Sequence, residues 1–261
     1  MPNPTKSHKF GPHELVAQPT KDGFVGIVRG KSQDRFHADT EDELLIQLQQ
    51  AALRESRDFI GYSGAIQRFN DLFPGGLGNE EFQRREVRPK RAASDFALSK
   101  IPPDESLIDK KEDILKAIQL TELLHPIEKA KLKDVLYSVD CAAFCEASRK
   151  MFEGRYLEAG KQLDATFKSR DLANWRILTY LPFLWDPKQH FFLRPTFLCQ
   201  FAAAVGHKFQ HDYSADLNPA VYESLLSLAA ETRSRLGADV NDNIEVQSFI
   251  WVAKQYRDDD V

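Results

Sequence analysis

The spacing of apolar residues predicts a helical protein with a few short strands. Residues 1–22 are polar and rich in proline, which is typical of a flexible lead-in. A short apolar run in residues 23–30, GFVGIVRG, predicts a strand. Thr40 and Glu43 then have the spacing of a capping box, and leucines follow at helical intervals. A helix is therefore expected over about residues 40–57.

The next stretch places a boundary between two parts of the chain. A second short helical pattern must end at residues 74–79, PGGLGN, because glycine and proline interrupt helices. From residue 80 to residue 100 arginines and lysines are interleaved with two phenylalanines, and Ile101 is followed by two prolines. We therefore expect a small α+β segment over residues 23–100 and a helical domain over residues 101–261.

Apolar periodicity predicts six helices in the second part, around residues 107–118, 132–143, 152–167, 174–181, 196–206 and 218–237. Pro182 is expected to end the fourth of these, because proline lacks the amide hydrogen that a helix interior requires. Residues 190–193 and 208–213 have the pattern of extended chain. Residues 244–256 fit either a strand or a helix.

Two stretches predict how the helices pack. Residues 174–205 hold two of the three tryptophans and a dense group of phenylalanines, which indicates the centre of a core. Residues 153–167 resemble the first half of a tetratricopeptide-type hairpin, but no second copy follows at a spacing of about 34 residues. The match therefore predicts only a helix that packs closely on a neighbour through Ala159 and Gly160.

Composition narrows the class of protein. The 261 residues carry 35 Lys and Arg against 39 Asp and Glu, which argues against a protein that coats nucleic acid with general positive charge. No run approaches the roughly 18 apolar residues that a membrane span needs, and the first residues lack the apolar core of a signal peptide. An odd number of cysteines, three, suits a reducing compartment. We expect a cytoplasmic protein without membrane contact.

A basic segment is the strongest candidate for a binding site. Its candidate residues are Phe82, Arg84, Arg85, Arg88, Lys90 and Arg91. Arginine and lysine neutralise phosphates, and an aromatic ring stacks on bases, so the segment predicts contact with nucleic acid. A solvated helix face with a core phenylalanine explains the same pattern. Arg29, Lys31 and Arg35 would extend the patch if the fold brings them near.

Metal chemistry has two sequence candidates. Cys141 and Cys145 could form a zinc site with His207 and His211, but the expected extended chain separates the two histidines by about 13 Å, too far to share an ion. No metal site is therefore expected from these two cysteines and two histidines.

The second candidate is a nuclease-like set formed by Asp239, Asp242, Glu245 and Lys254. The usual short step from carboxylate to lysine is missing here, and carboxylates that cap the start of a final helix explain the same residues.

Motifs for other chemistry are missing from the sequence. Neither a phosphate-binding P-loop nor a GxSxG or HExxH motif occurs. Cys199 could act as a cysteine nucleophile with His190 or His207, but the presence of these residues in one chain is the sole support for such a pair. We assign no catalytic residue and expect no cofactor.

Two blocks have a recognisable likeness: residues 59–77, FIGYSGAIQRFNDLFPGGL, and residues 178–197 combined with residues 243–252. They resemble an uncharacterised group of bacterial proteins associated with restriction-type or phage-defence neighbourhoods. The resemblance implies a bacterial cytoplasmic protein with a link to nucleic acid. It implies no activity, cofactor or catalytic residue.

These observations predict a mainly α protein, with a helical C-terminal domain and a small α+β N-terminal part. The leading functional hypothesis is a non-catalytic binding or adaptor protein, in which the helical domain contacts a protein partner and the basic segment contacts nucleic acid. The alternative is a metal-dependent nuclease or other hydrolase that uses the C-terminal carboxylates. A structural subunit is a third hypothesis, and the sequence does not determine the oligomeric state.

Overall fold

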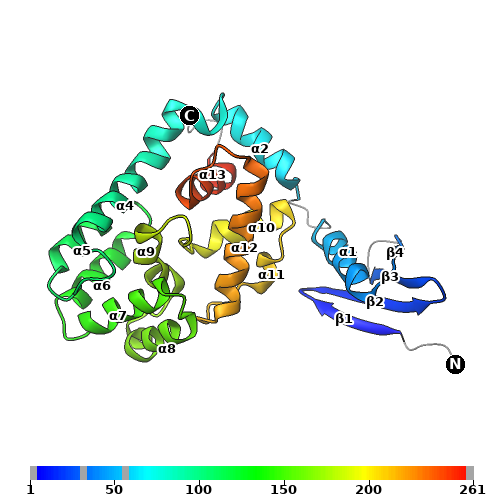
Figure 1. Ribbon diagram of the computed structural model, residues 1–261, viewed down its shortest axis with the longest axis horizontal. Coiled ribbons are helices and arrows are strands. Elements are labelled where there is room, and N and C mark those ends of the chain that lie inside the picture. The colour runs from blue at the N-terminus through cyan, green and yellow to red at the C-terminus, as the bar shows by residue number, and fades with distance from the viewer. Residues whose placement is uncertain (1–4, 30–33, 55–58, 257–261) are drawn as a thin grey trace.

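A computed structural model describes residues 5–29, 34–54 and 59–256 of the chain. It is mainly helical, with a small antiparallel sheet near the N-terminus, as the sequence predicts (Figure 1). The sheet and its helix consist of β1 Lys6–Phe10, β2 His13–Thr20, β3 Gly23–Arg29, β4 Phe36–Ala38 and α1 Glu41–Arg54. The first part of the helical body consists of α2 Gly61–Leu72, η1 Gly76–Gly78, α3 Glu80–Phe82, η2 Gln83–Val87, α4 Arg88–Lys100, α5 Lys111–Gln119 and α6 Pro126–Leu136. The remainder consists of α7 Cys141–Phe152, α8 Tyr156–Phe167, η3 Lys168–Arg170, α9 Trp175–Trp185, α10 Pro195–Val205, α11 Phe209–Asp212, α12 Pro219–Leu236 and α13 Asn243–Gln255.

The N-terminal sheet has the strand order β1-β2-β3-β4, and α1 covers one of its faces. The expected flexible lead-in over residues 1–22 is wrong for the described part, because residues 6–20 form β1 and β2. Leu15 and Ala17 bury their side chains under α1, whereas Glu14, Val16 and Gln18 beside them are not buried. Polar residues such as Glu14 and Gln18 in the outward-facing positions therefore hide the strand pattern in the sequence. The capping box of α1 is confirmed: the amide of Glu43 donates to Thr40 Oγ1 at 3.2 Å, and the amide of Thr40 donates to Glu43 Oε2 at 3.3 Å.

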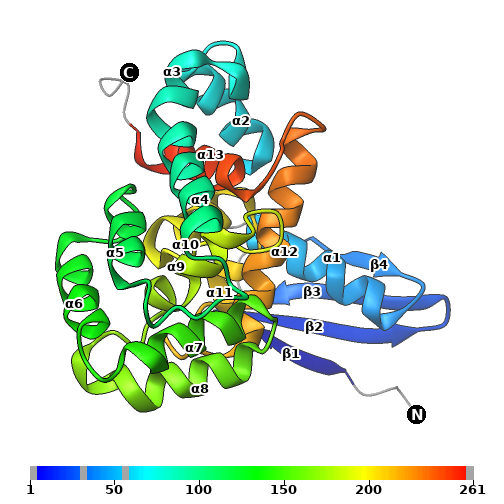
Figure 2. The same cartoon turned by 60° about the vertical axis from the view of Figure 1, so that its left-hand side comes forward.

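The apolar clusters do not divide at the expected boundary. One cluster lies between the sheet and α1, and a second runs from Ala65 to Ala253 without a break at residue 101. Ile101 itself is fully buried, and its carbonyl accepts a hydrogen bond of 2.7 Å from the indole of Trp185. The segment over residues 60–100 therefore packs with the helical body, and the sheet projects from that body with α1 (Figures 1 and 2).

The aromatic stretch over residues 174–205 forms the centre of the helical body, as predicted. Trp175, Phe183, Trp185 and Phe192 are at most 3% exposed. Helix α9 continues to Trp185, so the prediction that Pro182 ends it is wrong. A proline removes a single backbone hydrogen bond, and every residue from Ile177 to Trp185 is buried, so packing outweighs that loss.

Two further predictions differ from the structure, and one open choice is decided by it. The expected helix over residues 132–143 is two helices, since α6 ends at Leu136 and α7 begins at Cys141, and Val139 between them is 95% exposed. Residues 208–213, expected to be extended, contain the helical turn α11, which the ring of His207 caps by accepting the amide of Phe209 at 3.1 Å. The ambiguous residues 244–256 are helical, and Asp242 caps their N-terminus.

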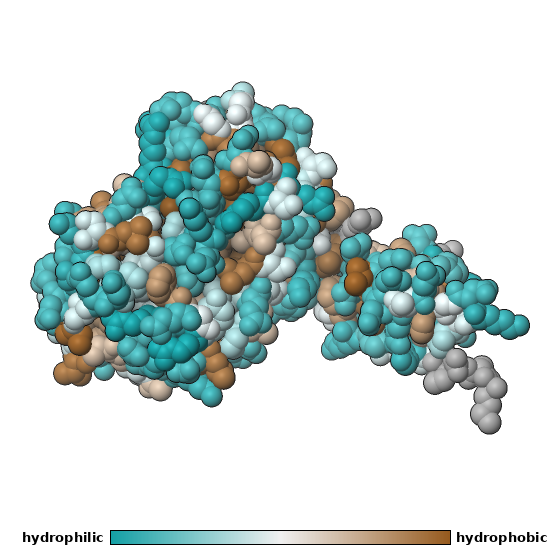
Figure 3. All heavy atoms as spheres, in the orientation of Figure 1, coloured by the Kyte–Doolittle hydropathy of each residue, from teal (hydrophilic) through white to brown (hydrophobic). Residues whose placement is uncertain are grey.

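The hairpin of α7 and α8 packs as the single tetratricopeptide-like match predicts. Ala159 is fully buried, and a Cβ atom at Gly160 would lie 2.7 Å from the carbonyl oxygen of Leu217. Among the described residues no helix combines the length and apolarity that crossing a bilayer demands. The face shown in Figure 3 is mostly hydrophilic, with scattered apolar residues on the helical body.

Candidate functional site

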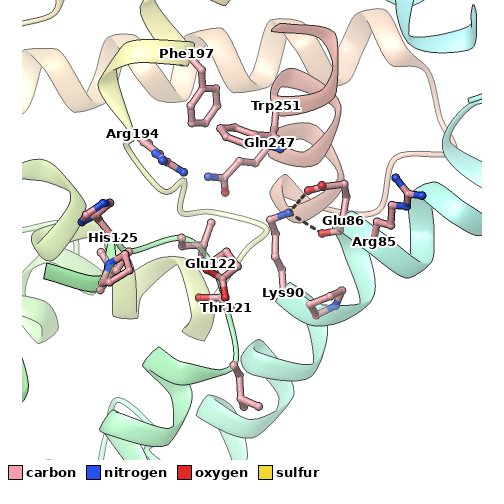
Figure 4. Close-up of a pocket in the computed structure, with 15 residues that line it drawn as sticks. Arg85, Glu86, Lys90, Thr121, Glu122, His125, Arg194, Phe197, Gln247 and Trp251 are labelled. Atoms are coloured by element: carbon pink, nitrogen blue, oxygen red, sulfur yellow. Dashed lines mark hydrogen bonds and ion pairs between the residues drawn. The ribbon is translucent and has the colours of Figure 1, made fainter. Parts of the chain in front are cut away.

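A pocket of about 560 Å³ opens in the helical body (Figure 4). Four segments form its walls: η2 with the start of α4, residues 120–126 between α5 and α6, the turn into α10, and α13. Apolar walls come from Leu120, Leu123, Leu124, Phe197, Pro89 and Pro126. Polar side chains come from all four segments, and they are Arg85, Glu86, Lys90, Thr121, Glu122, His125, Arg194 and Gln247.

Helix α13 contributes Gln247 and Trp251, which lie one turn apart and therefore on the same face. Gln247 is 2% exposed, and its amide points into the space between Arg194 and Lys90 (Figure 4). Its Oε1 atom is buried and accepts no hydrogen bond from any described residue. A buried polar atom without a partner costs about 1–3 kcal/mol, so the amide is expected to bind a water molecule or a ligand in the pocket.

Arg194 supplies a cation at the pocket wall. It precedes Pro195, the first residue of α10, and a residue before proline favours the extended backbone that Arg194 adopts, with φ −112° and ψ 102°. This backbone directs the guanidinium over the ring of Trp251, at 5.1 Å from its centroid. Burial lowers the pKa of Arg194, and the nearby charge of Arg176 lowers it further. Within the described part of the chain the guanidinium makes no hydrogen bond or ion pair.

Lys90 forms the opposite polar wall and is fully engaged. Its ammonium donates to the Glu86 carbonyl oxygen at 2.6 Å, to Glu86 Oε2 at 2.9 Å and to Ser248 Oγ at 3.1 Å. Burial lowers its pKa, while Glu86 opposes that effect. The π-helical turn η2 precedes it, and such turns frequently occur at functional sites. Lys90 therefore holds η2, α4 and α13 together and sets the shape of the pocket.

The remaining residues of the predicted basic segment lie apart from the pocket, except Arg85. Arg84 and Arg85 both pair with Glu81, and Arg88 pairs with Glu80 at 2.7 Å. Over residues 80–91 five basic side chains face three glutamates, so the segment carries a net charge of only +2. Phosphate contact by Arg84, Arg85 and Arg88 stays a prediction, and it would have to compete with these ion pairs.

Phe82 cannot stack on a base as the sequence pattern suggested. Its side chain is fully buried, with its ring 4.9 Å from that of Phe69 and 5.7 Å from that of Phe73. Arg29, which was expected to extend the patch, bonds to Glu14 at 2.8 Å within the N-terminal sheet. Lys31 lies outside the described residues.

The C-terminal carboxylates Asp242 and Glu245 have structural roles, and the metal-dependent alternative stays a prediction. Asp242 accepts the amides of Ile244 and Glu245 as the cap of α13, and its other oxygen pairs with Arg91 at 2.7 Å. Glu245 bonds to Asn241, and it too faces Arg91 at 3.6 Å. Among the residues that the structure describes, no three His, Cys, Asp or Glu side chains gather to hold a metal ion.

The cysteines give no sign of nucleophilic chemistry. Burial raises the pKa of the Cys199 thiol to about 11 and that of Cys145 to about 12, whereas a reactive cysteine needs a lowered pKa. The ring of His190 lies against the carbonyl of Phe152 and the hydroxyl of Tyr222. His207 is occupied by the cap of α11.

Sequence reasoning missed Arg194, Gln247 and Trp251. The one available signal was the spacing of Gln247 and Trp251, which places a polar residue four positions before an aromatic one. That spacing has meaning only on a helix, and the sequence left residues 244–256 open between strand and helix.

Comparison with family models, curated proteins and solved structures finds no match to this chain. The resemblance to a bacterial family in defence neighbourhoods therefore stays a prediction.

Proposed function

We propose that the protein is a non-catalytic binding protein, and that the pocket between α4, α10 and α13 takes an anionic group of its ligand. The observation that carries the proposal is the pairing of Arg194, whose guanidinium has no hydrogen-bonding partner among the described residues, with the buried, unpartnered amide of Gln247. Both groups reach the same pocket (Figure 4).

Basic side chains outnumber carboxylates in the pocket lining by three to two, which supports an anionic ligand. Arg85, Lys90 and Arg194 line the pocket, together with the carboxylates of Glu86 and Glu122. Glu86 is already engaged by Lys90 and by the hydroxyl of Tyr256. Arg194 therefore stands as the cation available to a ligand, and its planar fork of donors matches a carboxylate or phosphate.

The wider setting of this function extends the sequence-based predictions. We propose a cytoplasmic location, which the free thiols support: Cys141 and Cys145 lie with their sulfur atoms 3.9 Å apart and form no disulfide. A protein partner for the helical domain stays a prediction.

The test is calorimetric titration of the protein with pyrophosphate at constant ionic strength. We expect Arg194→Gln to weaken binding about 10- to 100-fold, because charge-assisted hydrogen bonds contribute about 1.5–3 kcal/mol. The matched control is Arg88→Gln, since Arg88 is exposed and lies outside the pocket. Its affinity should equal that of the wild type. Equal losses in both variants, or no binding of pyrophosphate at millimolar concentration, would contradict the proposal.

A further inference from the structure

We infer that the ligand is a nucleoside phosphate, with its base read by Gln247 and its phosphate held by Arg194. This inference rests on the proposed function, because it names the ligand of the same pocket. It goes beyond anion binding, which would use the guanidinium and the amide donor but gives no role to the amide acceptor beside them.

The amide of Gln247 calls for a partner with two complementary groups. A carboxamide presents a donor, Nε2, next to an acceptor, Oε1, in one plane. Neither atom has a hydrogen-bond partner among the described residues, and Oε1 is buried. At 2% exposure the side chain is almost wholly buried, and its amide is directed toward Arg194 (Figure 4). The edge of a nucleobase carries an acceptor next to a donor, and glutamine pairs with such an edge through two hydrogen bonds.

Flat surfaces surround this amide. Trp251 stands one helical turn further along α13, with the guanidinium of Arg194 over its ring and the ring of Phe197 edge-on to it at 5.4 Å. Leu120 and Leu123 also line the pocket. Planar aromatic and guanidinium groups suit the face of a base, and they discriminate little between bases. The choice among bases is therefore left to Gln247.

Arg194 is the cation for the phosphate because the others are engaged. The three hydrogens of the Lys90 ammonium already have three acceptors on Glu86 and Ser248. Arg85 pairs with Glu81. Figure 4 shows Arg194 beside Gln247 on the same rim of the pocket, so a single ligand can reach both.

The size of the pocket favours a single nucleotide over a strand. Its volume of about 560 Å³ lies within the range of about 300–1,000 Å³ that is typical of small-molecule sites. A strand would need a cationic track that continues beyond the pocket, and the exposed Arg84 and Arg88 next to it are neutralised by Glu81 and Glu80.

The experiment compares ligands that share a phosphate and differ in the base. The affinities of AMP, GMP, CMP and UMP are measured by calorimetry beside those of ribose 5-phosphate, pyrophosphate and an acidic tripeptide. We expect at least one nucleotide to bind about 10-fold or more tightly than ribose 5-phosphate. Gln247→Leu should remove that difference, so that nucleotides and ribose 5-phosphate bind with equal affinity. Arg194→Gln should weaken the binding of both.

Each other outcome is informative. If pyrophosphate binds in an Arg194-dependent way and no nucleotide exceeds ribose 5-phosphate, this inference fails and the proposed function stands. If no anion binds, the proposed function itself fails. A Gln247-dependent preference for the acidic tripeptide would overturn the nucleotide in favour of a peptide ligand. Should Gln247→Leu fail to fold, as judged by circular dichroism, Gln247→Met serves instead, since it is close in size to glutamine, carries no charge and removes the amide.

Discussion

His207 shows how a single buried side chain makes folding depend on pH. Its Nδ1 atom accepts the amide of Phe209, and its Nε2 atom lies 3.4 Å from the hydroxyl of Ser227. Protonation of Nδ1 would break the cap of α11. Burial lowers the pKa of His207 to about 4, with a further lowering by Lys208 and a partial opposing effect of Asp212.

We expect the burial of His207 to lower the free energy of unfolding at acidic pH. Because its pKa is lower in the folded than in the unfolded chain, the unfolded state binds the proton first as pH falls. The contribution of neutral His207 to the free energy of unfolding is complete above about pH 6.5. As pH decreases toward 4, this free energy falls by about 2–3 kcal/mol. Urea unfolding at pH 7.5 and 4.5 measures this for the wild type and for His207→Asn, whose side-chain oxygen can still accept an amide. The variant should lose less stability on acidification, and an identical loss in both proteins would refute the role of His207.

Gly160 is required by a neighbour and not by backbone conformation. An alanine there would improve the helix propensity of α8 by about 1 kcal/mol, but its Cβ would lie 2.7 Å from the Leu217 carbonyl. We therefore expect Gly160→Ala to lower the free energy of unfolding by about 1–3 kcal/mol, as overpacked sites do. Gly78→Ala is the matched control, because nothing lies within 4 Å of its added Cβ. The steric account is wrong if Gly160→Ala is as stable as the wild type or more stable.

Single residues also show what the sequence can and cannot specify. The ion pairs of Glu81 with Arg84 and Arg85 follow from spacings of three and four residues on a helix, so they could be predicted from the sequence. The burial of Phe82 could not, because it depends on Phe69 and Phe73 in another helix. A phenylalanine among arginines has the same local pattern in either case.

At the scale of the element, a helix start marked by a capping residue was better determined than a helix end. Thr40 caps α1 as its sequence signal indicates, since a cap depends on the next two or three residues alone. Pro182 inside α9 and the helical turn α11 depend instead on packing from distant parts of the chain. The local sequence pattern therefore does not predict the continuation of α9 through Pro182 or the helical turn α11.

Asp242 tests whether a carboxylate at the start of α13 acts as a cap. Asp242→Ala should lower the free energy of unfolding by about 1–2 kcal/mol, because the amides of Ile244 and Glu245 lose their acceptor and Arg91 loses its closer partner. Asp242→Asn keeps a good capping side chain and should lose clearly less. Urea unfolding of both variants provides the measurement. Equal losses would show that the charge, and not the cap, is what matters.

At the scale of the whole molecule, the sequence predicted the fold class but not how its parts divide. The mainly helical body and its aromatic centre follow from periodicity and composition. The position of the division does not, because the apolar residues over 60–100 have the same periodicity whether they pack on the sheet or on the helical body. The pocket could not be predicted from the sequence for the same reason. Its walls come from four segments between Arg85 and Trp251, and no local pattern brings them together.

A crystal structure of the protein with pyrophosphate tests the central claim most directly, which is that the helical body binds an anion in this pocket. The account predicts density for the ligand between α10 and α13, in contact with the guanidinium of Arg194. An empty pocket, with pyrophosphate bound instead along Arg84 and Arg88, would contradict it.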